Sequence, residues 1–201
     1  MNPTELAVLR FGERSIPRAL ASLRTWQVDD AAIIDPAVRG MRRVVVLGDY
    51  ADLAAVLTRL MRVELLDVEV AHVRGWRAAI RARTAAAQRV PLIRDDTGSA
   101  LVGSALWLPP EGAAAIHGEA VVDDTVIFDG DAAGVRIEPT ATMPGLRAAV
   151  LDGRRRRWVS GRAAQLGTTG ARVVRDGVAG AREAKRSTFY RHTTGWLRVG
   201  C

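Results

Sequence analysis

The spacing of apolar positions changes along the chain and divides it into two parts. Up to about residue 89, short apolar runs typical of buried strands alternate with apolar residues at the three-to-four-residue spacing of amphipathic helices. From about residue 90 the apolar segments are short and are separated by turn-forming pairs such as Asp-Gly and Pro-Gly. This pattern predicts an α+β protein with a small α/β lobe at residues 1–89 and an antiparallel β sandwich-like lobe at residues 90–201.

The first part is predicted to contain a small parallel or mixed sheet with helices. The run at residues 44–47 is Val-Val-Val-Leu, which is typical of a strand buried on both faces. Asp52 stands near the start of the helical pattern that follows, where a carboxylate favours the helix dipole. We expect strands at residues 5–11, 31–34, 44–47 and 65–73, and helices at residues 16–23, 53–61 and 76–89.

The second part is predicted to be an antiparallel sandwich or barrel, because turn compositions recur between its short apolar segments. Glycine in these turns supplies positive φ, and aspartate bonds to its own backbone. The expected strands are residues 90–94, 100–106, 116–122, 125–128, 135–138, 158–166, 171–175 and 196–199.

Composition excludes several classes of protein. The chain is 48% hydrophobic and 25% charged, which is close to an ordinary globular protein and far from a disordered one. No apolar run approaches the roughly 18 residues of a spanning helix, and the N-terminus lacks a signal-peptide pattern. The single cysteine, Cys201, rules out an internal disulfide and multi-cysteine metal sites. We therefore expect a cytoplasmic protein. The five tryptophans are expected to anchor the core or the sheet edges.

The net charge of +7 comes almost wholly from arginine, since Lys185 is the only lysine. Arginine grips phosphates and carboxylates with a planar fork, so the excess is consistent with an anionic partner. Codon bias in a GC-rich genome explains the same composition, and both interpretations stay open.

One segment resembles a known phosphate-binding loop. Residues 44–56, an apolar strand followed by Gly-Asp and a helix, resemble the place where the diacylglycerol kinase, sphingosine kinase and NAD kinase superfamily has its Gly-Gly-Asp-Gly-Thr loop. In that family the glycines let backbone amides approach nucleotide phosphates. The five corresponding positions here are Leu47, Gly48, Asp49, Tyr50 and Ala51, so only the central Gly-Asp is kept.

The resemblance implies a degenerate member of this superfamily. Tyr50 and Ala51 remove the close approach and the hydroxyl that the family's loop provides, and Asp176-Gly177 is followed by Val178 where lipid-kinase members have Asp-Gly-Glu. A relative of this kind would bind an anionic ligand, either a nucleotide or a lipid headgroup, or a protein partner, without transferring phosphate. Were it an enzyme, it would be a kinase-like phosphotransferase. A nucleotide or Mg²⁺ is the cofactor that the resemblance allows, and a homodimer stays open.

Basic residues in the last 50 positions add a second candidate region for an anion. Four arginines run into Trp158, and further basic residues surround an aromatic pair at residues 189–190, a mixture that can hold phosphates, stack bases or seat a lipid headgroup. Thr168 and Thr169 lie between glycines and offer hydroxyls to a small anion. A solvated loop is the alternative interpretation. The candidate ligand-binding residues are Gly48, Asp49, Arg154, Arg155, Arg156, Arg157, Thr168, Thr169, Lys185, Arg186 and Arg191.

Two other functions remain open. The first is a nucleic-acid-binding module that uses the same basic clusters. The second is a metal-assisted hydrolase that uses Asp123, Asp124, Asp129 and Asp131, although turn chemistry explains these aspartates equally well. The three histidines lack metal-ligand spacing, and no serine lies in a Gly-x-Ser-x-Gly motif.

Overall fold

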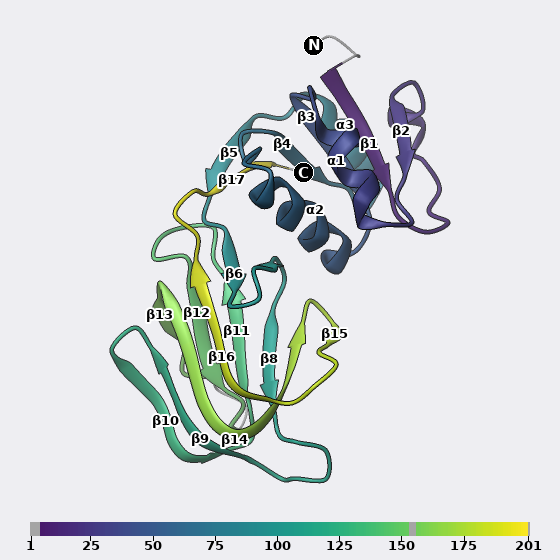
Figure 1. Ribbon diagram of the computed structural model, residues 1–201. Helices are drawn as coiled ribbons and strands as arrows, with labels where there is room; N and C mark the ends of the chain where they lie inside the picture. Colours follow the sequence, from purple (N-terminus) through teal and green to yellow (C-terminus); the bar gives the residue numbers. More distant parts are fainter. Residues whose placement is uncertain (1–4, 153–155, 201) are drawn as a thin grey trace. The chain divides into compact units, whose positions relative to one another are not determined.

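The computed structural model describes residues 5–152 and 156–200. The chain forms two compact units: Met1–Val90 together with Thr194–Cys201, and Pro91–Thr193. All helices of the described residues belong to the first unit, whereas the second is built from strands (Figure 1). The predicted α+β class is confirmed. None of the helices in the described part of the chain is long and apolar enough to cross a membrane.

The first unit contains a mostly parallel sheet. Its strands are β1 (Leu6–Arg10), β2 (Arg24–Gln27), β3 (Arg43–Leu47), β4 (Glu69–His72), β5 (Ala87–Val90) and β17 (Trp196–Val199). Their order is β2-β1-β3-β4-β17-β5, and all neighbours are parallel except β17 and β5. Strand β2 pairs with one edge of β1, and strand β3 pairs with the other edge. This makes a topological switch point, where open α/β sheets bind ligands beyond the carboxyl ends of their strands.

Helices cover the sheet because its central strands are apolar on both faces. The elements are the 3-10 turns η2 (Arg18–Leu20) and η3 (Ala31–Ile33) and the helices α1 (Ile34–Val38), α2 (Tyr50–Arg62) and α3 (Trp76–Thr84). On one face, Val8 and Val45 pack with Leu20 of η2 and Ala79 of α3. Strand residues that alternate with these, such as Val46, are also buried, and α2 buries a leucine-rich stripe along the sheet (Figure 1).

Two local expectations for the first unit were wrong. Residues 16–23 form only the turn η2, which lies in the connection from β1 to the parallel strand β2 at Arg24. The strand expected at residues 31–34 is helical instead. The carboxylate of Asp30 accepts a hydrogen bond from Ala32 N at 2.7 Å and starts η3, and Pro36 lies early in α1, where its missing N–H is tolerated.

Three other elements of this unit differ in position from the prediction. The helix expected at residues 76–89 ends at Thr84, and β5 follows it; the strand expected at residues 65–73 begins only at Glu69. The last strand, β17, was expected in the second lobe but lies between β4 and β5. Trp196 and Val199 are buried there, and an alternating apolar pattern does not specify which sheet a strand will join.

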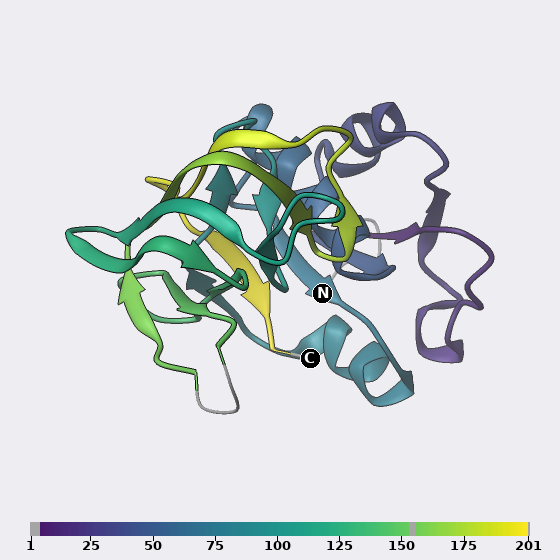
Figure 2. The same cartoon turned by 90° about the horizontal axis from the view of Figure 1, so that it is seen from below.

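The second unit is an antiparallel sheet that curves strongly, from which the teal β9–β10 hairpin projects (Figure 2). Its strands are β6 (Ile93–Asp95), β7 (Ala100–Leu101), β8 (Ala105–Leu108), β9 (Ile116–Val122), β10 (Thr125–Ala132), β11 (Val135–Pro139), β12 (Leu146–Val150), β13 (Val159–Gly161), β14 (Ala163–Arg175), β15 (Val178–Ala179) and β16 (Ala184–Arg191). The expected strand at residues 158–166 covers β13 and the start of β14, and β14 continues through the expected strand at residues 171–175. Strands β12, β15 and β16 were not predicted. The long β14 pairs with β9 and β16 near its start and with β8 near its end.

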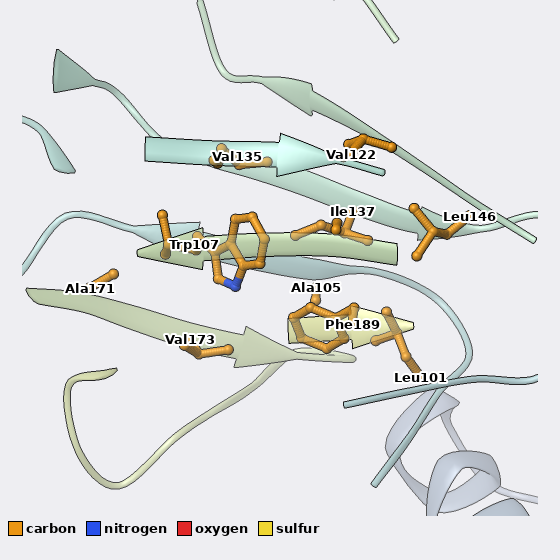
Figure 3. Packing of buried hydrophobic residues seen from close by; sticks show 14 of the residues in the cluster. Leu101, Ala105, Trp107, Val122, Val135, Ile137, Leu146, Ala171, Val173 and Phe189 are labelled. Atoms are coloured by element: carbon orange, nitrogen blue, oxygen red, sulfur yellow. The ribbon is translucent and has the colours of Figure 1, made fainter. Parts of the chain in front are cut away.

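The core of the second unit is centred on Trp107 and Phe189, whose ring centroids lie 6.0 Å apart (Figure 3). Both side chains are fully buried. The indole N–H of Trp107 donates a 3.0 Å hydrogen bond to Ser187 Oγ, which is buried as well. A buried indole N–H needs such an acceptor, so the serine on β16 fixes the tryptophan on β8.

Replacing Ser187 with alanine should destabilise the second unit. The substitution leaves the indole N–H of Trp107 without its acceptor, which costs about 1–3 kcal/mol of unfolding free energy. Tryptophan fluorescence during urea unfolding measures the change. Ser160→Ala, at an exposed position on β13, is the matched control and should leave the midpoint unchanged. Equal midpoints for Ser187→Ala and the wild type would contradict the role given to this hydrogen bond.

Candidate functional site

The first unit has a pocket of about 640 Å³ beyond the carboxyl ends of β1, β3 and β4. The loops after these three strands therefore form it, at the switch point of the sheet. The lining residues are Arg14, Ser15, Pro17, Leu47, Gly48, Asp49, Val73, Arg74, Gly75 and Trp76. The Gly48-Asp49 pair selected from the sequence is among them.

Asp49 and Asp52 cap the N-terminus of α2 reciprocally. Asp52 N donates to Asp49 Oδ1 at 3.0 Å, and Asp49 N donates to Asp52 Oδ2 at 2.8 Å. Gly48 makes room for this arrangement, since a Cβ there would lie 2.5 Å from the Cβ of Asp52. The reciprocal cap thus bonds the N–H of Asp52 and places two of the protein's own carboxylates at the start of α2.

Arg14, in the loop after β1, lies beside both caps. Its guanidinium is 3.7 Å from Asp49 Oδ2 and 3.6 Å from Asp52 Oδ2, and it also donates to the carbonyl of Phe11. The hydrogen bond from Asp52 N, aided by the charge of Arg14, lowers the pKa of Asp49. The side chain of Asp49 is 64% exposed. A carboxylate that stays ionised is therefore presented at the pocket.

Arg74 and Trp76 line the pocket, and the rings of His72 and Tyr50 lie next to its residues Gly48 and Arg74. His72 Nε2 lies 2.9 Å from the carbonyl of Gly48, and burial lowers the pKa of His72, so the neutral ring donates its Nε2–H there. The ring of Tyr50 lies 5.5 Å from that of His72, and the guanidinium of Arg74 stands 5.0 Å above Tyr50. Trp76, at the start of α3, is 65% exposed.

These groups provide recognition chemistry. Asp49 can accept hydrogen bonds from hydroxyls, Arg74 can hold an anionic oxygen, and Trp76 offers a flat apolar face. No group of three or more His, Cys, Asp or Glu side chains in residues 5–152 and 156–200 is arranged to hold a metal ion.

The basic candidates of the second unit lie in separate places. Arg186 is opposite Gly167 across β16 and β14, so Lys185 and Arg186 lie near Thr168 and Thr169. The hydroxyl of Thr168 donates to the carbonyl of His117 at 2.7 Å. Arg191 is at the other end of β16, where it donates to the carbonyl of Pro144. Arg156 and Arg157 are exposed between β12 and β13, and Arg154 and Arg155 lie outside the described residues.

Two of the four aspartates considered for a metal, Asp123 and Asp131, have structural partners. Both carboxylate oxygens of Asp123 accept from Arg162 N at 3.0 Å, and one accepts from Ala163 N at 2.9 Å. The carboxylate of Asp131 lies 2.9 Å from His117 Nδ1, and Asp129 stands opposite Glu119 in the register of the β9–β10 hairpin. Asp124 lies in the turn between β9 and β10.

The Asp-Gly pair near the C-terminus also has a structural role. The carboxylate of Asp176 accepts hydrogen bonds from the backbone N–H groups of Val102, Gly103 and Ser104 at 2.6–3.0 Å. It thus fixes the turn between β7 and β8.

The sequence did not identify Arg14, Arg74 or Trp76 as parts of the pocket. Trp76 was expected to anchor the core or a sheet edge, but its side chain is largely exposed. Their place after predicted strands could have identified them. Arg14 follows β1, and Arg74 and Trp76 follow β4, in the same way as Gly48-Asp49 follows β3. Carboxyl ends of neighbouring parallel strands meet at one edge of a sheet.

The pH dependence of stability tests the environment of His72. Because the folded state lowers the pKa of His72 below its usual 6.5, the unfolded chain takes up a proton that the folded protein does not. Stability should therefore fall as pH is lowered through about 6.5, until the folded pKa is passed. Unfolding free energies between pH 7.5 and 5.5 should show a shallower decrease for His72→Gln. A decrease unchanged by His72→Gln would contradict the assignment.

Comparison with known proteins identifies the fold. No protein-family model matches the sequence. No curated protein matches it either. Among solved structures, a diacylglycerol kinase from Bacillus anthracis str. Sterne is 10% identical and has a TM-score of 0.74, with 98% of this chain and 97% of that chain covered. Two further structures of the same assigned class from that organism reach a TM-score of 0.78.

Two nucleotide-bound structures are similar as well. An NAD kinase from Archaeoglobus fulgidus in complex with ATP is 11% identical, with a TM-score of 0.65 over 97% of this chain and 93% of that chain. The yeast NADH kinase complexed with NADH is 10% identical, with a TM-score of 0.62 over 100% of this chain and 84% of that chain. The resemblance noted at Gly48-Asp49 is confirmed for the fold: this chain has the fold of the diacylglycerol kinase and NAD kinase structures.

Proposed function

We propose that the protein binds a nucleotide in the pocket beyond β1, β3 and β4 and does not transfer phosphate. The observation on which this rests is the pocket of about 640 Å³, in which an ionised Asp49 lies between Arg14 and the Arg74–Trp76 segment. A nucleotide has a base, a hydroxyl-bearing sugar and phosphates, and the pocket offers one type of group for each.

The pocket suggests how such a ligand would bind. Trp76 would stack on the base, Asp49 would accept hydrogen bonds from ribose hydroxyls, and Arg74 would hold a phosphate. The phosphates would stay away from the α2 N-terminus, because the carboxylates of Asp49 and Asp52 occupy it and would repel them. The similar folds complexed with ATP and NADH support a nucleotide as the class of ligand.

The state of Asp49 argues against phosphate transfer. A general base works best when its pKa is near the working pH, but the helix cap and Arg14 lower the pKa of Asp49. An acceptor hydroxyl would therefore gain little from this carboxylate. Tyr50 and Ala51 also replace the glycine and threonine of the related loop.

Calorimetric titration with ATP and with NAD tests the binding. We expect Trp76→Ala to weaken the affinity about tenfold, because a base stacked on an aromatic ring contributes about 1–3 kcal/mol. Arg74→Ala should weaken ATP more than adenosine, since only ATP has phosphates for it to hold. Arg81→Ala, exposed on the same helix but outside the pocket, is the control and should bind both ligands normally. If the wild type binds neither ATP nor NAD, the proposal is wrong.

Turnover is tested separately. Purified protein incubated with ATP, Mg²⁺ and either diacylglycerol or NAD should give no phosphorylated product above the background without protein. Product formation that Asp49→Ala abolishes would show an active kinase and contradict the non-catalytic assignment.

The nucleic-acid alternative is distinguishable from nucleotide binding. The basic clusters proposed for nucleic acid lie at separate places of the second unit, so the described residues do not favour a continuous phosphate-binding surface. Binding to short DNA with a steep linear fall of log affinity against log salt would favour that alternative instead.

A further inference from the structure

Tyr50 lies next to the nucleotide pocket without being one of its lining residues. It is the first residue of α2 and directly follows the pocket residues Gly48 and Asp49. It stands where the loop that this segment resembles has its second glycine. Tyr50 is 42% exposed, so burial in the core does not explain a large aromatic side chain at this position.

His72 and Arg74 come from the end of β4 and the residues that follow it. Val73 N donates to the carbonyl of Val46 at 3.0 Å, so the pairing with β3 continues past His72. Val73 is buried, and alternate residues of an extended segment point to the same side. His72 and Arg74 therefore share the side opposite to Val73, and both contact Tyr50.

The contacts of Tyr50 connect two parts of the pocket. The ring centroid of Tyr50 lies 5.5 Å from that of His72 and 5.0 Å from the guanidinium carbon of Arg74. His72 in turn donates its Nε2–H to the carbonyl of Gly48 at 2.9 Å. A continuous series of contacts thus joins Gly48 to Arg74, and both of these residues line the pocket.

The Tyr50 ring is the anchor of the Arg74 guanidinium. Within residues 5–152 and 156–200, the side chain of Arg74 makes no hydrogen bond and no ion pair. A free arginine side chain loses many rotamers when it binds a ligand, whereas one already held over an aromatic ring loses fewer. The face of the ring is also a favourable place for a cation. Tyr50 therefore makes Arg74 a better anion-binding group.

We propose that Tyr50 is a positioning residue that holds Arg74 for the phosphates of the ligand, an inference that rests on the nucleotide binding proposed above. In the loop that this segment resembles, glycines let backbone amides approach the phosphates. Here the carboxylates of Asp49 and Asp52 lie at the start of α2, and the tyrosine at the position of the glycine holds an arginine side chain instead. The phosphate site therefore lies at the Arg74 guanidinium and not at the helix N-terminus.

Calorimetric titration with ATP and with adenosine tests this role. We expect Tyr50→Leu to weaken ATP binding about threefold, which corresponds to the contribution of a cation stacked on an exposed ring. Adenosine should bind unchanged, because it has no phosphate for Arg74 to hold. Tyr50→Phe keeps the ring and should bind both ligands like the wild type. Equal losses for ATP and adenosine in Tyr50→Leu would show that Tyr50 contacts the nucleoside itself, and the proposal would be wrong.

Trp26→Leu is the matched control. It removes a ring on which the guanidinium of Arg24 is stacked at 4.4 Å, in the same unit but outside the pocket. Its affinities for ATP and adenosine should equal those of the wild type. A loss of ATP affinity as large as that of Tyr50→Leu would show a general effect of removing an aromatic residue and would contradict the positioning role.

A double substitution shows whether the effect passes through Arg74. In the Arg74→Ala background, Tyr50→Leu should cause no further loss of ATP affinity, because the group that it positions is already absent. If Tyr50→Leu weakens ATP binding about threefold in both backgrounds, Tyr50 does not act through Arg74 and the inference is refuted.

Tyr50→Gly restores the glycine of the resembled loop and separates two interpretations of this position. If Tyr50 holds Arg74, the affinity for ATP should fall as it does in Tyr50→Leu. If the tyrosine only blocks the approach of phosphates to the loop, the affinity should rise instead, and this result would overturn the proposal.

The ¹H–¹⁵N resonance of the Arg74 Nε–H reports the contact in the absence of a ligand. The ring current of residue 50 should shift this resonance in the wild type and in Tyr50→Phe, and the shift should be lost in Tyr50→Leu. A resonance unchanged in Tyr50→Leu, in a protein that binds ATP, would refute this inference alone. A wild type that binds neither ATP nor NAD would refute the nucleotide pocket and, with it, the role of Tyr50.

Discussion

The reciprocal capping of α2 by Asp49 and Asp52 determines the geometry of the candidate nucleotide site. The two hydrogen bonds, at 2.8 and 3.0 Å, orient the loop after β3 and require a glycine at position 48. They also place two carboxylates where Arg14 pairs with them, and they turn the carbonyl of Gly48 toward His72. Without this cap, the helix N-terminus would offer free amides to an anion. With it, the same position is negatively charged, and a ligand's phosphates must be held elsewhere.

This protein has the fold of the kinase structures, whereas the chemistry that we propose for its pocket is binding without phosphate transfer. The fold is kept at 10–11% identity because it depends on patterns that many residues satisfy, namely apolar central strands, a capped helix after β3 and a buried antiparallel core around Trp107. The site depends on individual residues. Tyr50 stands where the loop that it resembles has a glycine, and a shared fold does not establish a shared activity.

The sequence predicted the parts of the structure that local pattern determines. The apolar run before Gly48 and the helical spacing after it place β3 and α2 correctly, and they led to one side of the pocket. The predictions from local pattern were wrong where contacts between distant parts of the sequence determine the structure. The segment at residues 16–23 has helical spacing but is only a 3-10 turn, and β17 joins the first sheet across a large separation in sequence. The exposure of Trp76 depends on the alanines with which α3 packs on the sheet, since Ala79 and Ala82 face inward.

The most direct test of the central claim is to follow the ¹⁵N amide and indole resonances of the protein while ADP is added. If a nucleotide binds beyond β1, β3 and β4, the largest shifts should occur at the Trp76 indole N–H and at the backbone of Gly48, Asp49 and Arg74, which line that pocket. Shifts confined to residues 91–193, or none at saturating ADP, would contradict the account.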